Sequence, residues 1–147
     1  MIKTTVIGSY PKPDYLNLPD WFDGNKDHKT ELANIFFLQN KNELEKIFIK
    51  ATEEVIREQT EIGIDIITDG EVRRENYIYN FCRTLNIDFN NLTKRVLRNG
   101  AYTTDCPTIF DKLTVKDSNR YYSEEWVKSN KIAQKYNKID RKSTRLN

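Results

Sequence analysis

Two glycine-containing turns carry the residues of this sequence that could bind a small charged molecule. Gly8-Ser9 ends a short β-branched run, and Asp69-Gly70-Glu71 ends a longer apolar run. Glycine lets backbone approach a ligand closely, and backbone N–H groups exposed at such a turn can hold a carboxylate. The Ser9 hydroxyl adds a donor, and the Glu71 carboxylate suits an ammonium group. Together the two turns could hold both ends of an amino acid, if the fold brings them to the same place.

Both turns also have a purely structural interpretation. A Gly-Ser pair after a strand is commonly a plain turn, and Asp-Gly is an ordinary turn dipeptide. Glu71 is followed closely by Arg73, Arg74 and Glu75, which together could form a surface ion-pair patch of little energetic weight.

The other side chains that could bind metal or act as nucleophiles are few and scattered. His28, the only histidine, lies in a long loop and is expected to face solvent. Cys82 and Cys106 have no paired spacing, so they indicate neither a disulfide framework nor a zinc ribbon. Cys82, beside an aromatic residue on a predicted helix, is expected to be a small packing residue. Trp21, Trp126 and the eight tyrosines are expected to pack rather than to stack on a ligand.

The first turn follows a predicted strand and precedes a long irregular segment. Residues 4–8 are β-branched and stop at glycine, which is typical of a buried strand. Residues 9–41 contain three prolines and an aromatic pair, which favour an ordered loop. A short helix is plausible over 32–39.

The second turn follows a predicted helix and strand. We expect a helix from Asn42, with Glu45 completing a capping box, to an αL stop at Gly63. The run 64–68 follows directly and is apolar except for Asp65, which is typical of a parallel, interior strand. The apolar positions of the helix are Leu44, Ile47, Phe48, Ala51, Val55 and Ile62.

The rest of the chain is expected to add a helix over 77–85, an antiparallel pair over 95–100 and 108–116, and a helix over 123–136. The apolar face of the first of these helices is Tyr77, Ile78, Phe81 and Leu85. Parallel strands need cover on both faces and partners on both edges, and the third strand is expected to be missing. The fold class is therefore α/β: the N-terminal part of a (β/α)8 TIM barrel, truncated after about the first two β/α units. In such barrels the active site lies at the carboxyl ends of the strands.

Two motifs, TTVIGSYPKP and EVIREQTEIGIDIITDGEVRRENYIYNF, resemble the catalytic barrel of cobalamin-independent methionine synthase, in particular its short single-barrel type. The resemblance runs from about Thr4 to Tyr136. It implies that Ile7, Gly8 and Ser9 bind homocysteine and that Glu71 contacts its ammonium group. Asp69, where larger enzymes of the family often have histidine, is expected to support the site from behind.

The resemblance also implies a reaction and its cofactors. In the family, zinc holds the homocysteine sulfur as a thiolate that attacks the methyl group of 5-methyltetrahydrofolate. The zinc ligands come from the later half of the barrel and are expected beyond the end of this chain. No metal ligand and no catalytic residue is therefore assigned here. Tyr102 and Thr103 lie near the region where the family contacts folate, and they stay unassigned.

Composition and charge set the class of protein. The chain has 147 residues, 37% hydrophobic and 31% charged, which suits one globular unit. No apolar run approaches the roughly 18 residues that span a bilayer, and the apolar stretch at the N-terminus is too short for a signal peptide. We therefore expect a cytoplasmic protein that acts on small molecules, without a membrane partner.

The last eight residues, DRKSTRLN, account for the positive net charge. They hold three basic groups and one acid, so the 24 basic and 22 acidic groups of the chain become 21 of each without them. A neutral body without a basic cluster argues against nucleic-acid binding. Residues 140–147 also resemble a translated sequencing adapter. We expect 1–139 to be the native domain and 140–147 a non-native tail; a genuine disordered tail is the alternative.

Two other functions are compatible with parts of the pattern. A related barrel could transfer methyl groups with another thiol or a corrinoid donor, or resemble uroporphyrinogen decarboxylase, but a thiol without an amine would not need Glu71. A small stand-alone binding protein is the alternative outside enzymes. The expected lack of a third parallel strand and the adapter-like tail weigh against it.

Overall fold

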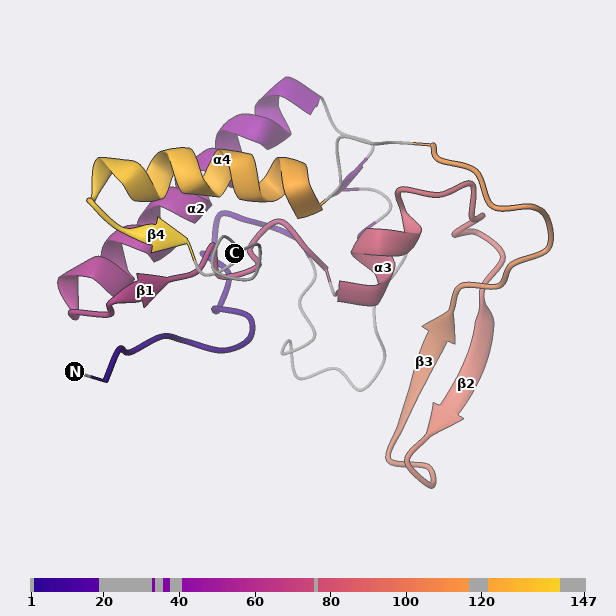
Figure 1. The fold of residues 1–147 in the computed structure, drawn as a ribbon. Helices are drawn as coiled ribbons and strands as arrows, with labels where there is room; N and C mark the ends of the chain where they lie inside the picture. Colours follow the sequence, from indigo (N-terminus) through magenta and orange to yellow (C-terminus); the bar gives the residue numbers. More distant parts are fainter. Residues whose placement is uncertain are drawn as a thin grey trace. The chain divides into compact units, whose positions relative to one another are not determined.

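The computed structural model describes residues 2–18, 33, 36–37, 41–75, 77–116 and 122–140 (Figure 1). The chain divides into two compact units: unit 1 comprises Met1–Leu16, Asn42–Arg73 and Tyr122–Asn147, and unit 2 comprises Asn17–Lys41 and Arg74–Tyr121. Trp21, His28 and residues 141–147 lie outside the described residues, as does most of the helix expected over 32–39. In the described part of the chain, no helix is long and apolar enough to cross a membrane.

Helix α2 (Lys41–Glu61) is the longest element of unit 1, and the apolar periodicity predicted it. At its C-terminus Gly63 has a φ of 86°. The Gly63 N–H donates to the Thr60 carbonyl (3.1 Å), and the Ile64 N–H donates to the Gln59 carbonyl (2.9 Å). These two bonds form a Schellman motif and confirm the predicted glycine stop. Ile62, which the periodicity placed on the apolar face, is instead 63% exposed.

Asn42, which the sequence predicts as the cap of α2, lies within the helix. It is the second residue of the described range, Lys41–Glu61. The Glu45 carboxylate accepts hydrogen bonds from Arg73 and Lys128. Hydrogen bonds between two charged groups are about twice as strong as neutral ones, so the long-range ion pairs prevail over a local cap.

Strand β1 (Ile66–Ile67) lies between two parallel neighbours. It pairs with β4 (Ile139–Asp140), with Ile66 opposite Ile139. Thr5 makes a parallel bridge to Ile66, and the Ile66 N–H donates to the Thr4 carbonyl (3.0 Å). The parallel, interior strand predicted after α2 is therefore confirmed, although it is shorter than 64–68.

The third parallel strand, which the sequence analysis placed outside the chain, is present as β4. Helix α4 (Tyr122–Lys135) confirms the predicted last helix, and it leads through a short turn into β4. Asp140, which the sequence analysis assigned to the tail, is fully buried and accepts a hydrogen bond from the Ser129 hydroxyl. A strand of two residues, one of them charged, has no periodicity that could reveal it.

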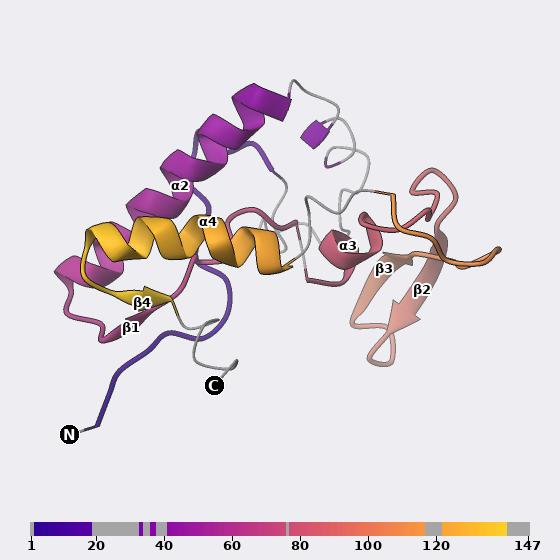
Figure 2. The same cartoon turned by 45° about the horizontal axis from the view of Figure 1, so that its top comes forward.

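The core of unit 1 lies between the helices and the parallel strands. Ile56 of α2, Ile67 of β1, and Ile132 and Ala133 of α4 form one cluster in which no member is more than 5% exposed. Figures 1 and 2 show α2 and α4 on the same side of β1 and β4. This packed layer fixes the strand ends, and with them the turns that follow.

The N-terminal segment is not the buried strand that its composition predicts. Ile2 is 94% exposed and Ile7 is 84% exposed. The segment is held on β1 by Asp65, whose carboxylate accepts hydrogen bonds from the Thr4 N–H and hydroxyl, 2.8 Å each. A β-branched composition reports how well residues suit a pleated surface, whereas burial depends on what covers them.

Unit 2 contains helix α3 (Tyr77–Cys82) and a hairpin of β2 (Thr93–Leu97) and β3 (Tyr102–Cys106). The two strands are antiparallel. Residues 98–101 join the two strands, and Arg98, Asn99 and Gly100 have φ of 50°, 55° and 90°. An antiparallel pair is confirmed, but its second strand is β3 and not 108–116.

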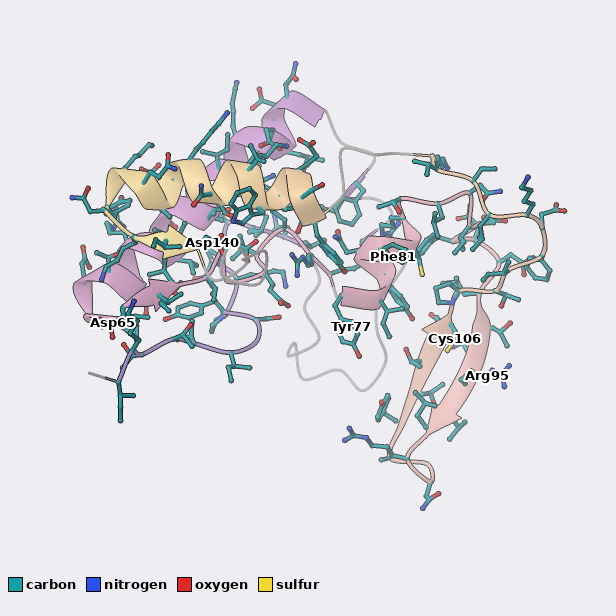
Figure 3. All side chains as sticks on the ribbon, in the orientation of Figure 1. Asp65, Tyr77, Phe81, Arg95, Cys106 and Asp140 are labelled. Atoms are coloured by element: carbon teal, nitrogen blue, oxygen red, sulfur yellow. The ribbon has the colours of Figure 1, made fainter. Side chains whose placement is uncertain are left out.

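The apolar face predicted for the helix over 77–85 is wrong. Tyr77, Ile78 and Phe81 are 67%, 49% and 52% exposed, and Tyr77 and Phe81 project from α3 in Figure 3. Tyr79 and Asn80 are buried instead, and the Tyr79 hydroxyl lies 3.2 Å from the Thr104 hydroxyl. In so short a helix the tertiary partners, and not the local pattern, select the buried face.

Candidate functional site

The two turns singled out by the sequence meet in unit 1. The Ser9 hydroxyl donates a hydrogen bond to Glu71 Oε2 at 3.2 Å, across 62 positions of sequence. Ser9 follows the segment that bridges to β1, and Glu71 follows β1 itself. Since the two segments run parallel and side by side, their carboxyl ends lie at one edge, which brings a hydroxyl donor and a carboxylate together.

Gly70 allows the two turns to approach this closely. Its φ is 65°, and its carbonyl accepts a hydrogen bond from the Tyr10 N–H at 2.9 Å. A Cβ at this position would lie 2.7 Å from Val55 Cγ1 and 2.9 Å from Tyr10 Cβ. Only glycine fits between the first turn and α2 without displacing one of them.

The end of β1 is held by a side chain of α2. Gln59 is fully buried, its Oε1 accepts from the Thr68 N–H (2.8 Å), and its Nε2 donates to the Thr68 carbonyl (2.8 Å). The side-chain amide thus pairs with both backbone hydrogen-bonding groups of Thr68. Immediately after it, Asp69 Oδ1 accepts from the Glu71 N–H (3.1 Å), and Glu71 has a φ of 55°. These bonds fix the backbone that presents the Glu71 side chain.

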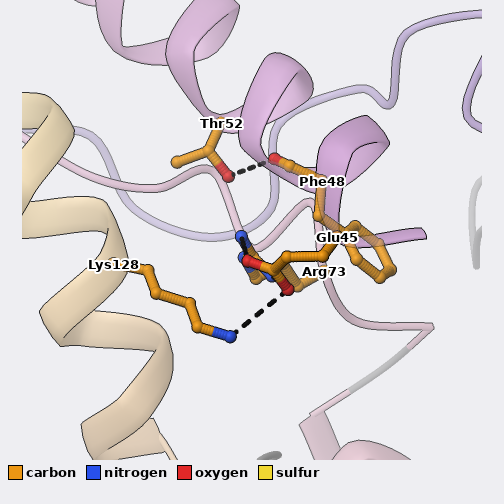
Figure 4. Close-up of polar contacts among 5 residues, drawn as sticks. All are labelled: Glu45, Phe48, Thr52, Arg73 and Lys128. Atoms are coloured by element: carbon orange, nitrogen blue, oxygen red, sulfur yellow. Dashed lines mark hydrogen bonds and ion pairs between the residues drawn. The ribbon is translucent and has the colours of Figure 1, made fainter. Parts of the chain in front are cut away.

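A charge network holds the other end of the turn (Figure 4). Arg73 Nη1 and Nη2 donate to the two Glu45 oxygens at 2.9 and 3.0 Å, and Lys128 Nζ lies 3.2 Å from Glu45 Oε2. The Arg73 guanidinium also lies over the Phe48 ring, 5.2 Å from its centroid. Burial alone would raise the pKa of Glu45, but the two cations hold that pKa below its ordinary value.

The positions of the charges exclude the surface ion-pair interpretation of this stretch. Arg73, Arg74 and Glu75 are 8%, 6% and 2% exposed, so they are not a solvated patch. Glu75 pairs with Arg83 in unit 2. Glu71 alone is only partly buried, at the point where it meets Ser9.

The remaining residues of the predicted site take different positions. Asp69 is 2% exposed, and its carboxylate accepts a hydrogen bond from the Glu71 N–H. Gly8 is exposed with a φ of 85°, and Ile7 is 84% exposed. Tyr102 and Thr103 lie on β3 in unit 2 and keep no assigned role.

The described residues do not fit a zinc site. Among them, no group of three or more histidine, cysteine, aspartate or glutamate side chains is close enough to hold a metal ion. Cys82 and Cys106 are free thiols in unit 2, and burial raises the pKa of Cys82, which disfavours the thiolate that zinc binds.

Sequence reasoning missed the residues that support the site. Gln59 falls on the buried face of α2, four residues after Val55, and a polar residue at such a position indicates a specific partner. Glu45 has the spacing of a capping residue, so the local pattern gives no sign of its bond to Arg73. The contact of Tyr10 with Gly70 could not be predicted from the type of side chain, because the Tyr10 backbone N–H makes it.

Comparison with known proteins identifies the family. The model of the family described as cobalamin-independent synthase, catalytic domain, matches residues 2–135, and the chain belongs to this family. The match covers both turns of the site and the elements that support them.

Individual relatives agree with this assignment. Methionine synthase of Sulfolobus acidocaldarius is 35% identical over 85 residues, and that of Saccharolobus solfataricus is 31% identical over 86; each match covers 58% of this chain and 22% of the relative. A solved B12-independent methionine synthase from a Shewanella species, in complex with selenomethionine, superposes with a TM-score of 0.66 at 26% identity. That superposition covers 87% of this chain and 34% of the Shewanella chain.

Proposed function

We propose that this chain is the homocysteine-binding part of a cobalamin-independent methionine synthase, which transfers a methyl group from 5-methyltetrahydrofolate to homocysteine. Ile7, Gly8 and Ser9 hold the carboxylate through backbone N–H groups and the Ser9 hydroxyl. Glu71 holds the ammonium group, and Asp69 supports Glu71 from behind.

One observation carries this proposal: the 3.2 Å hydrogen bond between Ser9 and Glu71. An α-amino acid bears its ammonium and carboxylate groups on a single carbon atom. The Ser9 hydroxyl, which donates its one proton to Glu71 in this structure, would turn to the ligand carboxylate on binding and leave Glu71 to accept from the ammonium group. The family to which the chain belongs supports homocysteine as that ligand.

The fold part of the proposal is that the chain forms the first strands and helices of a (β/α)8 barrel. Thr5, β1 and β4 are parallel and adjacent in chain order, and α2 and α4 connect them. This succession is how such a barrel begins. Within the same proposal, residues 1–139 belong to the catalytic domain and 140–147 to a non-native tail. Asp140 is the exception, because it completes β4.

Zinc and 5-methyltetrahydrofolate enter the proposal through the family alone. Zinc, when bound, would supply activation of the homocysteine sulfur as a thiolate. Since the described residues do not fit a zinc site, the proposed task of this chain is to hold the amino-acid end of the substrate. We expect small-molecule substrates and a cytoplasmic setting.

Glu71→Gln in the complete gene product tests the proposal. Glutamine keeps the shape and removes the charge that faces the ammonium group. We expect homocysteine to bind about 2 to 3 kcal/mol more weakly, which is about 30- to 140-fold in Kd. Isothermal titration calorimetry with L-homocysteine measures this, and metal analysis of the same samples should show unchanged zinc content.

Ser9→Ala is the companion variant. It should weaken homocysteine binding less than Glu71→Gln does, because backbone N–H groups remain to hold the carboxylate. A Glu71→Gln protein that binds homocysteine within twofold of wild type, or that loses zinc instead, contradicts the assignment.

A further inference from the structure

The turn that carries Glu71 is tied to helix α2 at both ends. Upstream, Gln59 bonds to the N–H and carbonyl of Thr68, 2.8 Å each. Downstream, Glu45 pairs with Arg73 at 2.9 and 3.0 Å. The four residues from 69 to 72 therefore lie between Thr68 and Arg73, which are both fixed to one rigid helix.

The Glu45–Arg73 pair at the downstream end of the turn is more than a charge contact. Arg73 presents two N–H groups to the two Glu45 oxygens, and this fork geometry fixes direction as well as distance. The Arg73 side chain is 9% exposed and lies over the Phe48 ring. Lys128 of α4 holds Glu45 Oε2 from another side (Figure 4). These contacts restrict the movement of the Arg73 side chain.

Only one residue separates Arg73 from Glu71. Val72 is 1% exposed, so the link itself is packed. Glu71 has a φ of 55°, a conformation that non-glycine residues adopt at a cost, so the surrounding bonds must maintain it. If Arg73 were released, the Glu71 backbone could relax and carry its carboxylate away from Ser9.

We propose that Glu45 and Arg73 are positioning residues that hold the Glu71 carboxylate where it meets a substrate ammonium group. They thereby set the selectivity of the site for thiols that carry an amine. This inference rests on the proposed function, because it assigns to Glu71 the recognition of the amine.

The test compares two thiols that differ only in the amine. L-Homocysteine and 4-sulfanylbutanoate share the thiol, the chain and the carboxylate. The selectivity ratio is the Kd of 4-sulfanylbutanoate divided by the Kd of L-homocysteine, both measured by calorimetry on the complete gene product. This ratio reports the contribution of the amine. A general loss of structure weakens both ligands alike and leaves the ratio unchanged.

Glu45→Gln and Arg73→Gln each break the fork. Either variant should lower the ratio by about tenfold, since misplacing a group by about 1 Å can cost on the order of a hundredfold. Arg73→Lys, which keeps the charge and loses the fork, should fall between wild type and Arg73→Gln. Glu45→Gln, at a partly exposed site, supplies the answer if Arg73→Gln does not fold.

Glu53→Gln is the matched control. Glu53 also lies on α2 and also pairs with a lysine of α4, Lys135 at 3.2 Å, but neither residue contacts the turn over 69–73 in any described bond. The same substitution there should leave the ratio unchanged.

The outcomes separate the two proposals. A wild-type ratio near one, or a ratio that Glu71→Gln does not reduce, overturns the proposed function. If Glu71→Gln abolishes the selectivity while Glu45→Gln and Arg73→Gln keep it within twofold, the positioning role alone is wrong. A Glu53→Gln ratio that falls as far as that of Glu45→Gln would also overturn it.

Discussion

Replacing Gly70 with alanine tests whether the two turns of the site are held in direct contact. The new Cβ would lie 2.7 Å from Val55 Cγ1 and 2.9 Å from Tyr10 Cβ. The Val55 side chain is 4% exposed, and the Tyr10 N–H is bonded to the Gly70 carbonyl, so neither neighbour can move freely. Overpacking of this kind costs about 1 to 3 kcal/mol, and a left-handed backbone with a Cβ costs about 1 to 2 kcal/mol.

The expected loss for Gly70→Ala is therefore about 2 to 5 kcal/mol in the free energy of unfolding. Gly63→Ala is the matched control, because Gly63 has a φ of 86° and nothing lies within 4 Å of its Cβ position. It should cost only the backbone part, about 1 to 2 kcal/mol. Urea unfolding followed by circular dichroism measures both variants. If they lose the same stability within about 0.5 kcal/mol, the close approach of the turns, and the steric part of this estimate, would be refuted.

Three further outcomes are expected. Hydrogen bonds from the N-terminal segment lower the pKa of Asp65 from its ordinary 3.8. Asp65→Asn should therefore have a lower free energy of unfolding than wild type at pH 7. This difference in stability should shrink as the pH falls below 3.8, because the wild-type carboxylate becomes protonated. Equal gaps at pH 7 and pH 2.5 in urea titrations would contradict this. Gln59→Leu removes the side-chain partner of the Thr68 N–H and carbonyl and should lower the free energy of unfolding by about 2 to 5 kcal/mol. A loss under about 1 kcal/mol would show that the two Gln59–Thr68 hydrogen bonds are dispensable. Since burial raises the pKa of Cys82, a Cys106→Ser protein should react with a disulfide reagent at pH 8 more slowly when folded than in urea, and equal rates would count against the burial.

The helices of unit 1 could be predicted because their signals are local. The apolar residues of α2 recur at helical spacing over 21 residues, and Gly63 marks its end. The same holds for α4. Errors arose where a local pattern competed with a distant partner, as at Glu45, which resembles a capping residue and pairs with Arg73.

Strands were harder to predict because their pairing is not local. β4 has two residues, and only their pairing with Ile66 and Ile67 reveals it as a strand. The N-terminal run has strand composition, but it meets β1 as an isolated bridge between Thr5 and Ile66 rather than as a strand of several residues. In α3 the buried residues are Tyr79 and Asn80, which no apolar periodicity could select.

The two turns of the site could be predicted because each follows an apolar run and combines glycine with a polar side chain. That Ser9 and Glu71 bond to each other follows only from the parallel pairing of the segments that precede them. The supporting residues Gln59 and Arg73 bond to residues nine and 28 positions away, and neither spacing is a recognised sequence signal.

A crystal structure of the complete gene product with L-methionine bound tests the substrate assignment most directly. We expect the ammonium nitrogen about 3 Å from a Glu71 carboxylate oxygen, with the carboxylate of methionine against Ser9 and the backbone N–H groups beside it. Methionine bound with its ammonium group turned away from Glu71, or bound at a site that includes neither Ser9 nor Glu71, would contradict it.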